Sequence, residues 1–252
     1  MSTLVKLTRV ETKLFVREPL AVIFSFAFPI FVLFILSGVF GTELDRGDEE
    51  EVRIWRGVTP NNYYLPAYVG LTMAAIGLIT LPLRLASYRE EGVLRRFRAA
   101  GVPVASIIGS QALVALGMAV IGSIAMVVVA RIGYGTELPQ LWPETIAAFA
   151  LSALMFAAIG VFLGSLLPTA RTAQGAGLIA FFVMMFISGA GPPRETLTGA
   201  MQTLSEVLPL THVVILLQDA WLGFGWDLPA MLVVVATGVV ATAASVRFFR
   251  WE

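Results

Sequence analysis

The side chains that could do chemistry in this chain are concentrated in one short stretch, YREEGVLRRFRAAGVP, at residues 88–103. Six charged residues fall within positions 89–98, and four of them are arginines. Arginine pairs with acidic protein surfaces and with anionic lipids, so the chemistry of this stretch is recognition by charge. No Ser/His, paired Asp or His/Glu constellation stands within the long apolar runs around it, so the sequence predicts no enzyme.

Cofactor and metal sites are not expected either. Cysteine is absent, and His212 has no second ligand at helical spacing, so the sequence predicts no metal site. The phosphate-binding motif G-x-x-x-x-G-K-[ST] is absent, and neither lysine lies near a glycine-rich loop. We therefore expect this chain to bind no cofactor and no nucleotide of its own.

The elements that must position the charged stretch are membrane spans. The chain has 252 residues, of which 58% are hydrophobic and 13% charged, and its mean hydropathy is +0.84. Six apolar runs are each long enough for a helix to cross about 30 Å of hydrocarbon, and only helices satisfy their own backbone there. The sequence predicts an all-α integral membrane protein, one transmembrane domain over 1–252, with spans near 20–40, 63–87, 104–130, 145–167, 172–190 and 228–247.

Basic residues are distributed unevenly between the two sides of this arrangement. Twelve of the 17 fall in the segments that share a side with both termini. Loops rich in lysine and arginine stay in the cytoplasm, so we expect cytoplasmic termini and a cytoplasmic charged stretch between the second and third spans.

The first 19 residues are predicted to form an amphipathic helix. One arc of that helix carries Leu4, Leu7, Val10, Leu14 and Phe15, although Glu11 interrupts it, and the opposite arc carries Lys6, Arg9, Lys13 and Arg17. A basic amphipathic helix before a first span is typical of a segment lying in the membrane interface, in contact with lipids. The alternative is a frayed basic tail.

Residues 191–227 are too polar for a clean span and too apolar for an ordinary loop. Pro192-Pro193 interrupts the preceding run, and short apolar runs follow at 197–208 and 210–222. Runs of this length are typical of re-entrant or interfacial helices, so we expect an extracellular re-entrant helical hairpin before the last span. A plain extracellular loop is the alternative.

Two pairs of small residues predict close helix packing inside the membrane. They are Gly160-x-x-x-Gly164 in the fourth span and Ala173-x-x-x-Gly177 in the fifth. This spacing allows two helix backbones to approach closely, either within one chain or between two copies.

Residues 89–100 of the charged stretch are predicted to form a short helix, with Glu90 and Glu91 in its first turn and Gly101 closing it. Val93, Leu94 and Phe97 belong to an apolar stripe on this helix. A helix lying on the bilayer would explain these features without any protein partner, so that alternative stays open.

No charged residue lies deep in a span, and Arg84 stands near enough to a span end to reach water. Ion-coupled carriers usually need an ionisable group at mid-membrane. A secondary transporter is therefore less favoured than a transport subunit driven by another protein. A membrane assembly protein is a further, less favoured alternative. Energy for transport would come from a separate ATPase, for which the charged helix is a natural contact.

The chain resembles the membrane subunits of ABC type-2 transporters, the group that contains daunorubicin-resistance and other drug or lipid export permeases. The stretch Glu90-Glu91-Gly92-Val93-Leu94-Arg95-Arg96-Phe97-Arg98-Ala99 is similar to the family's acidic-Gly-Thr-Leu stretch, with Val93 in place of threonine. Leu208-Pro209-Leu210-Thr211-His212-Val213 resembles its Pro-Leu-Thr-aromatic stretch before the last span. The resemblance also covers the amphipathic helix, six spans and hairpin.

The resemblance implies a permease in the plasma (inner) membrane of a prokaryote. A second permease subunit, identical or homologous, and two copies of a cytoplasmic ABC ATPase would complete the exporter, with ATP and Mg on the ATPase and no nucleic acid as partner. Residues 88–101 would be the coupling helix in a cleft of the ATPase, with contacts from Glu90, Glu91, Gly92, Val93, Leu94, Arg95, Arg96, Phe97 and Arg98. The substrate would be amphipathic, drug-like or lipid-like.

Overall fold

The computed structural model describes residues 3–248 of the chain, and its secondary structure over these residues is helical without strands. Six stretches within them are long and apolar enough to cross a membrane, which confirms the predicted fold class. They are Ile23–Phe40, Pro60–Glu90, Val104–Tyr134, Trp142–Leu166, Ala170–Ile187 and Leu228–Phe248. Six residues of the predicted domain, 1–2 and 249–252, lie outside the described part.

Thirteen α-helices make up the described chain, and several of them join end to end within one span. Their bounds are α1 Thr3–Val16, α2 Pro19–Val22, α3 Phe28–Phe40, α4 Glu49–Ile54, α5 Pro60–Ala75, α6 Leu81–Glu90, α7 Val93–Ala99, α8 Val104–Tyr134, α9 Trp142–Leu166, α10 Ala170–Ile187, α11 Gly199–Val207, α12 Pro209–Leu222 and α13 Leu228–Phe248. A π-helical turn at Ile23–Ala27 begins the first span, and another at Ile76–Thr80 interrupts the second. Such turns admit one extra residue into a helix without ending it.

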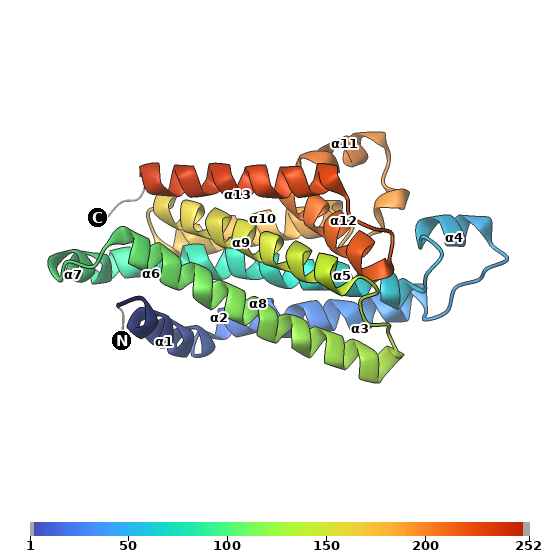
Figure 1. The fold of residues 1–252 in the computed structure, drawn as a ribbon, viewed down its shortest axis with the longest axis horizontal. Helices are drawn as coiled ribbons and strands as arrows, with labels where there is room; N and C mark the ends of the chain where they lie inside the picture. The colour runs from blue at the N-terminus through green and yellow to red at the C-terminus, as the bar shows by residue number, and fades with distance from the viewer. Residues whose placement is uncertain (1–2, 249–252) are drawn as a thin grey trace.

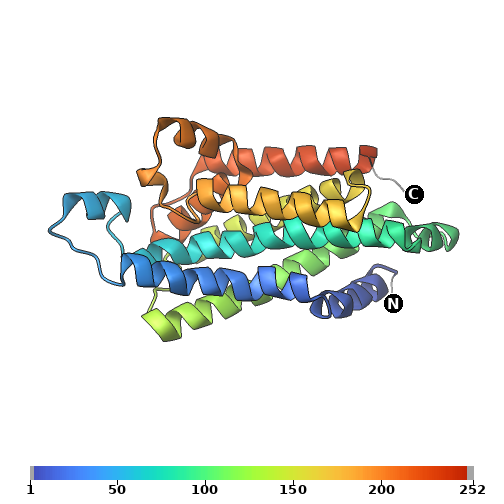
Figure 2. The same cartoon turned by 180° about the vertical axis from the view of Figure 1, so that it is seen from behind.

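The long helices lie side by side along one axis of the molecule (Figure 1). The helices α1 and α7 and the last turns of α13 gather at one end, whereas α4 and α11 lie at the other. Seen from behind, α3, α5 and α10 are neighbours (Figure 2). The charged stretch therefore lies at the same end of the bundle as the amphipathic helix.

The second span, α5 to α6, forms the centre of the bundle. Its most apolar window is 100% buried by the rest of the chain, against 22% for α10 and for α13. Glycines allow this close packing, because a Cβ on Gly160 would overlap the Gly77 carbonyl and one on Gly177 would overlap the Leu78 carbonyl. A Cβ on Gly164 would overlap Leu85. Both predicted small-residue pairs therefore pack within one chain.

The segment before the last span forms two helices that meet at 88°. Pro209 stands in the first turn of α12, where a missing backbone N–H costs nothing. The helix α12 packs against α5, α9 and α13 and is mostly buried, whereas α11 is mostly exposed. Both predicted short runs are helical, and re-entry into the membrane stays a prediction.

Polar contacts hold the end of the bundle that carries α4. Arg56 pairs with Asp219 of α12 at 2.6 Å, and its guanidinium carbon lies 4.3 Å from the centre of the Phe224 ring. Tyr63 of α5 donates a 2.7 Å hydrogen bond to Glu195. These contacts join the α4 loop and α5 to the segment 195–224.

Candidate functional site

The charged stretch is built as a turn between two helices, and the predicted continuous helix over 89–100 is wrong. The helix α6 continues through Glu90, and Gly92 then takes a left-handed conformation with φ of 68°. The Gly92 N–H donates to the Arg89 carbonyl at 3.1 Å, which closes α6. Glycine adopts this conformation without the steric cost that other residues bear, so the helix ends here rather than beginning.

The second helix of the turn, α7, is short and has a charged outer side. Gly101 closes it with φ of 70°, as predicted. Leu94 is only 1% exposed, and Val93 and Phe97 are half-buried. The exposed side chains of the predicted coupling residues are Glu90, Glu91, Arg95, Arg96 and Arg98. The apolar stripe therefore faces the chain itself, and the charges face outward.

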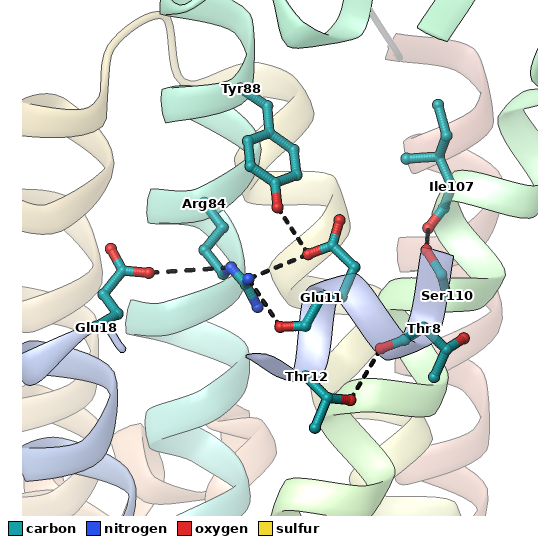
Figure 3. Close-up of polar contacts among 8 residues, drawn as sticks. All are labelled: Thr8, Glu11, Thr12, Glu18, Arg84, Tyr88, Ile107 and Ser110. Carbon is teal, nitrogen blue, oxygen red and sulfur yellow. Dashed lines mark hydrogen bonds and ion pairs between the residues drawn. The ribbon is translucent and has the colours of Figure 1, made fainter. Parts of the chain in front are cut away.

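A buried ion pair joins α6 to the amphipathic helix α1 (Figure 3). Nη2 of Arg84 lies 3.1 Å from Oε2 of Glu11 and donates to the Glu11 carbonyl at 2.9 Å. The Tyr88 hydroxyl donates to the same carboxylate at 2.8 Å. Both charged side chains are 3% exposed, so the prediction that Arg84 reaches water is wrong.

This pair was the functional feature that sequence reasoning missed, although its signal is present. Glu11 falls on the apolar arc of α1, and Arg84 falls inside an apolar run. Each charge alone is costly in such a place, and two costly charges of opposite sign indicate a pair. The pair attaches α1 to the span that leads into α7.

Glu18 extends the cluster at its edge. Its carboxylate lies 3.9 Å from Nε of Arg84, and its side chain is 30% exposed. Burial raises the pKa of the Glu18 carboxyl above its usual value, and the positive charge of Arg84 opposes this effect. Nearby hydroxyls bond locally instead, from Thr12 to the Thr8 carbonyl and from Ser110 to the Ile107 carbonyl (Figure 3).

Arg89 attaches the other side of the turn to α9. Its Nη1 donates to the Leu167 carbonyl at 2.7 Å, and its Nη2 donates to the carbonyls of Gly164 and Ser165 at 2.9 and 3.3 Å. The last carbonyls of a helix have no partner within it, and a cation there also complements the helix dipole. The sequence showed Arg89 only as one more loop charge.

A groove of about 720 Å³ lies between α1 and the α6–α7 turn. Val93 and Phe97 line it from α7, and Leu7, Val10 and Leu14 line it from α1. The predicted basic arc of α1 is exposed as expected, at Lys6, Arg9, Lys13 and Arg17, whereas the side chain of Leu4 lies outside the described ones. Part of the apolar arc packs against the rest of the chain, since Phe15 is fully buried.

Comparison with known proteins relates this chain to a family of membrane transporters. The profile of the family described as "ABC-2 type transporter" matches residues 3–222, which include α1, the α6–α7 turn and α12. The chain is 28% identical over 200 residues to the inner membrane transport permease YhhJ of Escherichia coli (strain K12), covering 73% of this chain and 52% of that protein. It is also 28% identical over 143 residues to Nodulation protein J of Rhizobium meliloti (strain 1021), covering 57% of this chain and 52% of that protein.

The chain thus spans about half the length of the curated relatives it matches. The profile match extends over most of the chain and covers five of the six spans as well as the charged turn. The chain belongs to the ABC-2 type transporter family of membrane permeases.

Proposed function

We propose that this chain is the permease subunit of an ATP-binding cassette exporter in the inner membrane of a prokaryote. It works with a second permease subunit, identical or homologous, and with two copies of a cytoplasmic ATPase that binds ATP and Mg. The substrate is amphipathic, drug-like or lipid-like, and both termini of the chain are cytoplasmic. The ATPase contacts the α6–α7 turn.

The observation that carries this proposal is the direction in which the turn presents its side chains. A helix that only lies on the bilayer needs a free apolar side, but α7 already buries Leu94 against its own chain. The exposed side of α7 carries Arg95, Arg96 and Arg98, and Glu90 and Glu91 are exposed just before it, at the end of α6. A charged rim of this kind is suited to steering and aligning a protein partner.

A second observation favours transmission through the turn. Arg84 fixes α6 to α1, and Arg89 fixes it to the end of α9. A partner that displaces the turn therefore displaces three elements together. This arrangement supports a role in which ATPase movement reaches the spans, whereas an ion-coupled carrier would need an ionisable group at mid-membrane.

Affinity purification of the full chain from its host tests the proposal. An ATPase should co-purify, and the native mass should fit two permease and two ATPase subunits. Reversing the charge at Arg96 and Arg98 to Glu should release the ATPase. The matched control reverses Arg46 and Arg53, which are exposed at the opposite end of the bundle, and should retain it. Purification without any ATPase, or equal retention by both variants, would contradict the proposal.

A further inference from the structure

A wedge opens between α8 and α9 toward the end of the bundle that carries α4. Both views show α8 leaving the other helices in this half of the molecule (Figures 1 and 2). The space between the helices has a volume of about 360 Å³. We call it the α8–α9 wedge, and its lining residues are Val120, Ser123, Ile124, Val127, Val128, Leu138, Pro139, Trp142, Thr145, Ile146, Phe149 and Trp221.

The wall of the α8–α9 wedge presents hydrocarbon and aromatic rings. Its two hydroxyl groups add little polarity, because Thr145 donates to the Leu141 carbonyl at 2.8 Å and Ser123 is 8% exposed. The indole N–H of Trp221 is also engaged, with the Glu137 carbonyl at 3.2 Å. A water molecule needs two to four polar partners, so a space with this lining excludes water and accepts an apolar group.

The wedge is open toward the bilayer rather than toward the protein. Ile124 is 58% exposed, Ile146 is 62% exposed and Trp142 is 52% exposed, although all three belong to spans. Trp142 begins α9, at the depth where tryptophan is enriched in membrane proteins. The apolar group that enters the wedge therefore comes from the surrounding lipid.

A basic side chain stands beside the mouth of the wedge. Arg131 follows Val127 and Val128 by one helical turn, so it lies on the same face of α8. It is exposed in the last turn of that helix, and its Nη1 donates to the Thr136 carbonyl at 2.9 Å. A guanidinium at the level of the lipid headgroups complements the charge of a phosphate.

We propose that the α8–α9 wedge binds one phospholipid, with an acyl chain between the helices and its phosphate on Arg131. The lipid belongs to the leaflet at the α4 end of the bundle, which is the outer leaflet in the orientation proposed above. The site requires neither the ATPase nor a second permease. It is a lipid site on the side of the bundle formed by α8 and α9, away from the α6–α7 turn.

Native mass spectrometry of the purified protein with added phosphatidylglycerol tests this proposal. One phospholipid should remain bound at detergent concentrations that strip the others. Ile124→Phe places a ring in the wedge, so the acyl chain loses its packing contacts there and the fraction of protein that retains the phospholipid should fall. Ile121→Phe is the matched control, since Ile121 is 56% exposed on the same helix but does not line the wedge.

Two further arms keep the test decisive. Ile146→Phe fills the wedge from α9 and should act like Ile124→Phe if one of these variants fails to fold. Arg131→Gln should weaken binding of phosphatidylglycerol and leave diacylglycerol, which has the same chains without phosphate, unchanged. Equal loss in the Ile121 and Ile124 variants, or no retained lipid in the unmodified protein, would overturn the proposal.

Discussion

Glu11 and Arg84 show at the scale of single residues how a distant partner determines what a charge does. Each is placed where an unpaired charge would be costly, and together they leave 3% of each side chain exposed. Their separation along the chain explains why hydropathy and helical periodicity could not reveal the contact. The pair makes the amphipathic helix a fixed part of the bundle.

Removal of one partner should therefore cost far more than removal of both. We expect Glu11→Ala to lower the free energy of unfolding by about 3–5 kcal/mol, because Arg84 is left buried with only the more distant Glu18 carboxylate, 3.9 Å away, as its counter-ion. Lys13→Ala, at an exposed position of the same helix, is the control and should change it little. Unfolding temperatures in detergent measure the stability of both single variants. The double variant Glu11→Leu, Arg84→Met should recover much of the stability that Glu11→Ala loses. Equal effects of Glu11→Ala and Lys13→Ala would refute the structural role of the pair.

Phe97 is the side chain of α7 whose loss should separate binding from transmission. It is half-buried beside α1 and lines the groove there. Truncation of this ring removes packing between α7 and α1 within the chain. Phe97→Ala should reduce transport sharply while any ATPase that remains bound hydrolyses ATP without responding to substrate.

Arg96→Ala is the comparison for this prediction, because its side chain belongs to the charged rim. Its effect should be smaller and should shrink at high salt, since screening weakens contacts between exposed charges. Transport assays in proteoliposomes at two salt concentrations distinguish the two variants. Full transport and full ATPase assembly with Phe97→Ala would show that the packing of this ring against α1 is not needed for transmission.

At the scale of elements, the α6–α7 turn acts as a joint with two attachments. Arg89→Ala should free the last turn of α9, because three carbonyl oxygens lose their donor. Hydrogen exchange at residues 164–172 should become faster, while Arg98→Ala, which removes an exposed arginine of α7, should leave it unchanged. Unaltered exchange in Arg89→Ala would show that the cap does not hold this end of α9.

The sequence predicts the elements that depend on local composition, and it does not predict those that depend on distant contacts. The six spans are determined by the bilayer, which requires about 20 apolar residues per helix, and this requirement is visible in any window of the sequence. The helix breaks at Gly92 because this one residue adopts a left-handed backbone conformation. The residues around it favour a helix, so the composition of the segment did not predict the break. The Arg89 cap depends on α9, which is far away in the sequence, and the π-helical turns depend on packing around them.

At the scale of the whole molecule, the ends of the bundle differ in character, and their placement in the membrane can be measured. The α4 end carries Asp48 on an exposed loop, and the opposite end carries Arg98. Because the chain contains no cysteine, single cysteines at these two positions are the only thiols in the protein. An impermeant reagent should label position 48 in intact cells and position 98 only after permeabilisation. The reverse pattern would invert the orientation and exclude the ATPase from the α6–α7 turn.

The complete burial of the second span has a consequence for how the protein tolerates sequence change. A helix on the outside of a bundle can vary on its lipid face, so accepted substitutions recur every three or four positions. The window within α5 and α6 has no such face, because all of it is enclosed by the same chain. Deep mutational scanning would therefore record a continuous band of intolerance there, without helical periodicity, flanked by spans in which tolerance alternates.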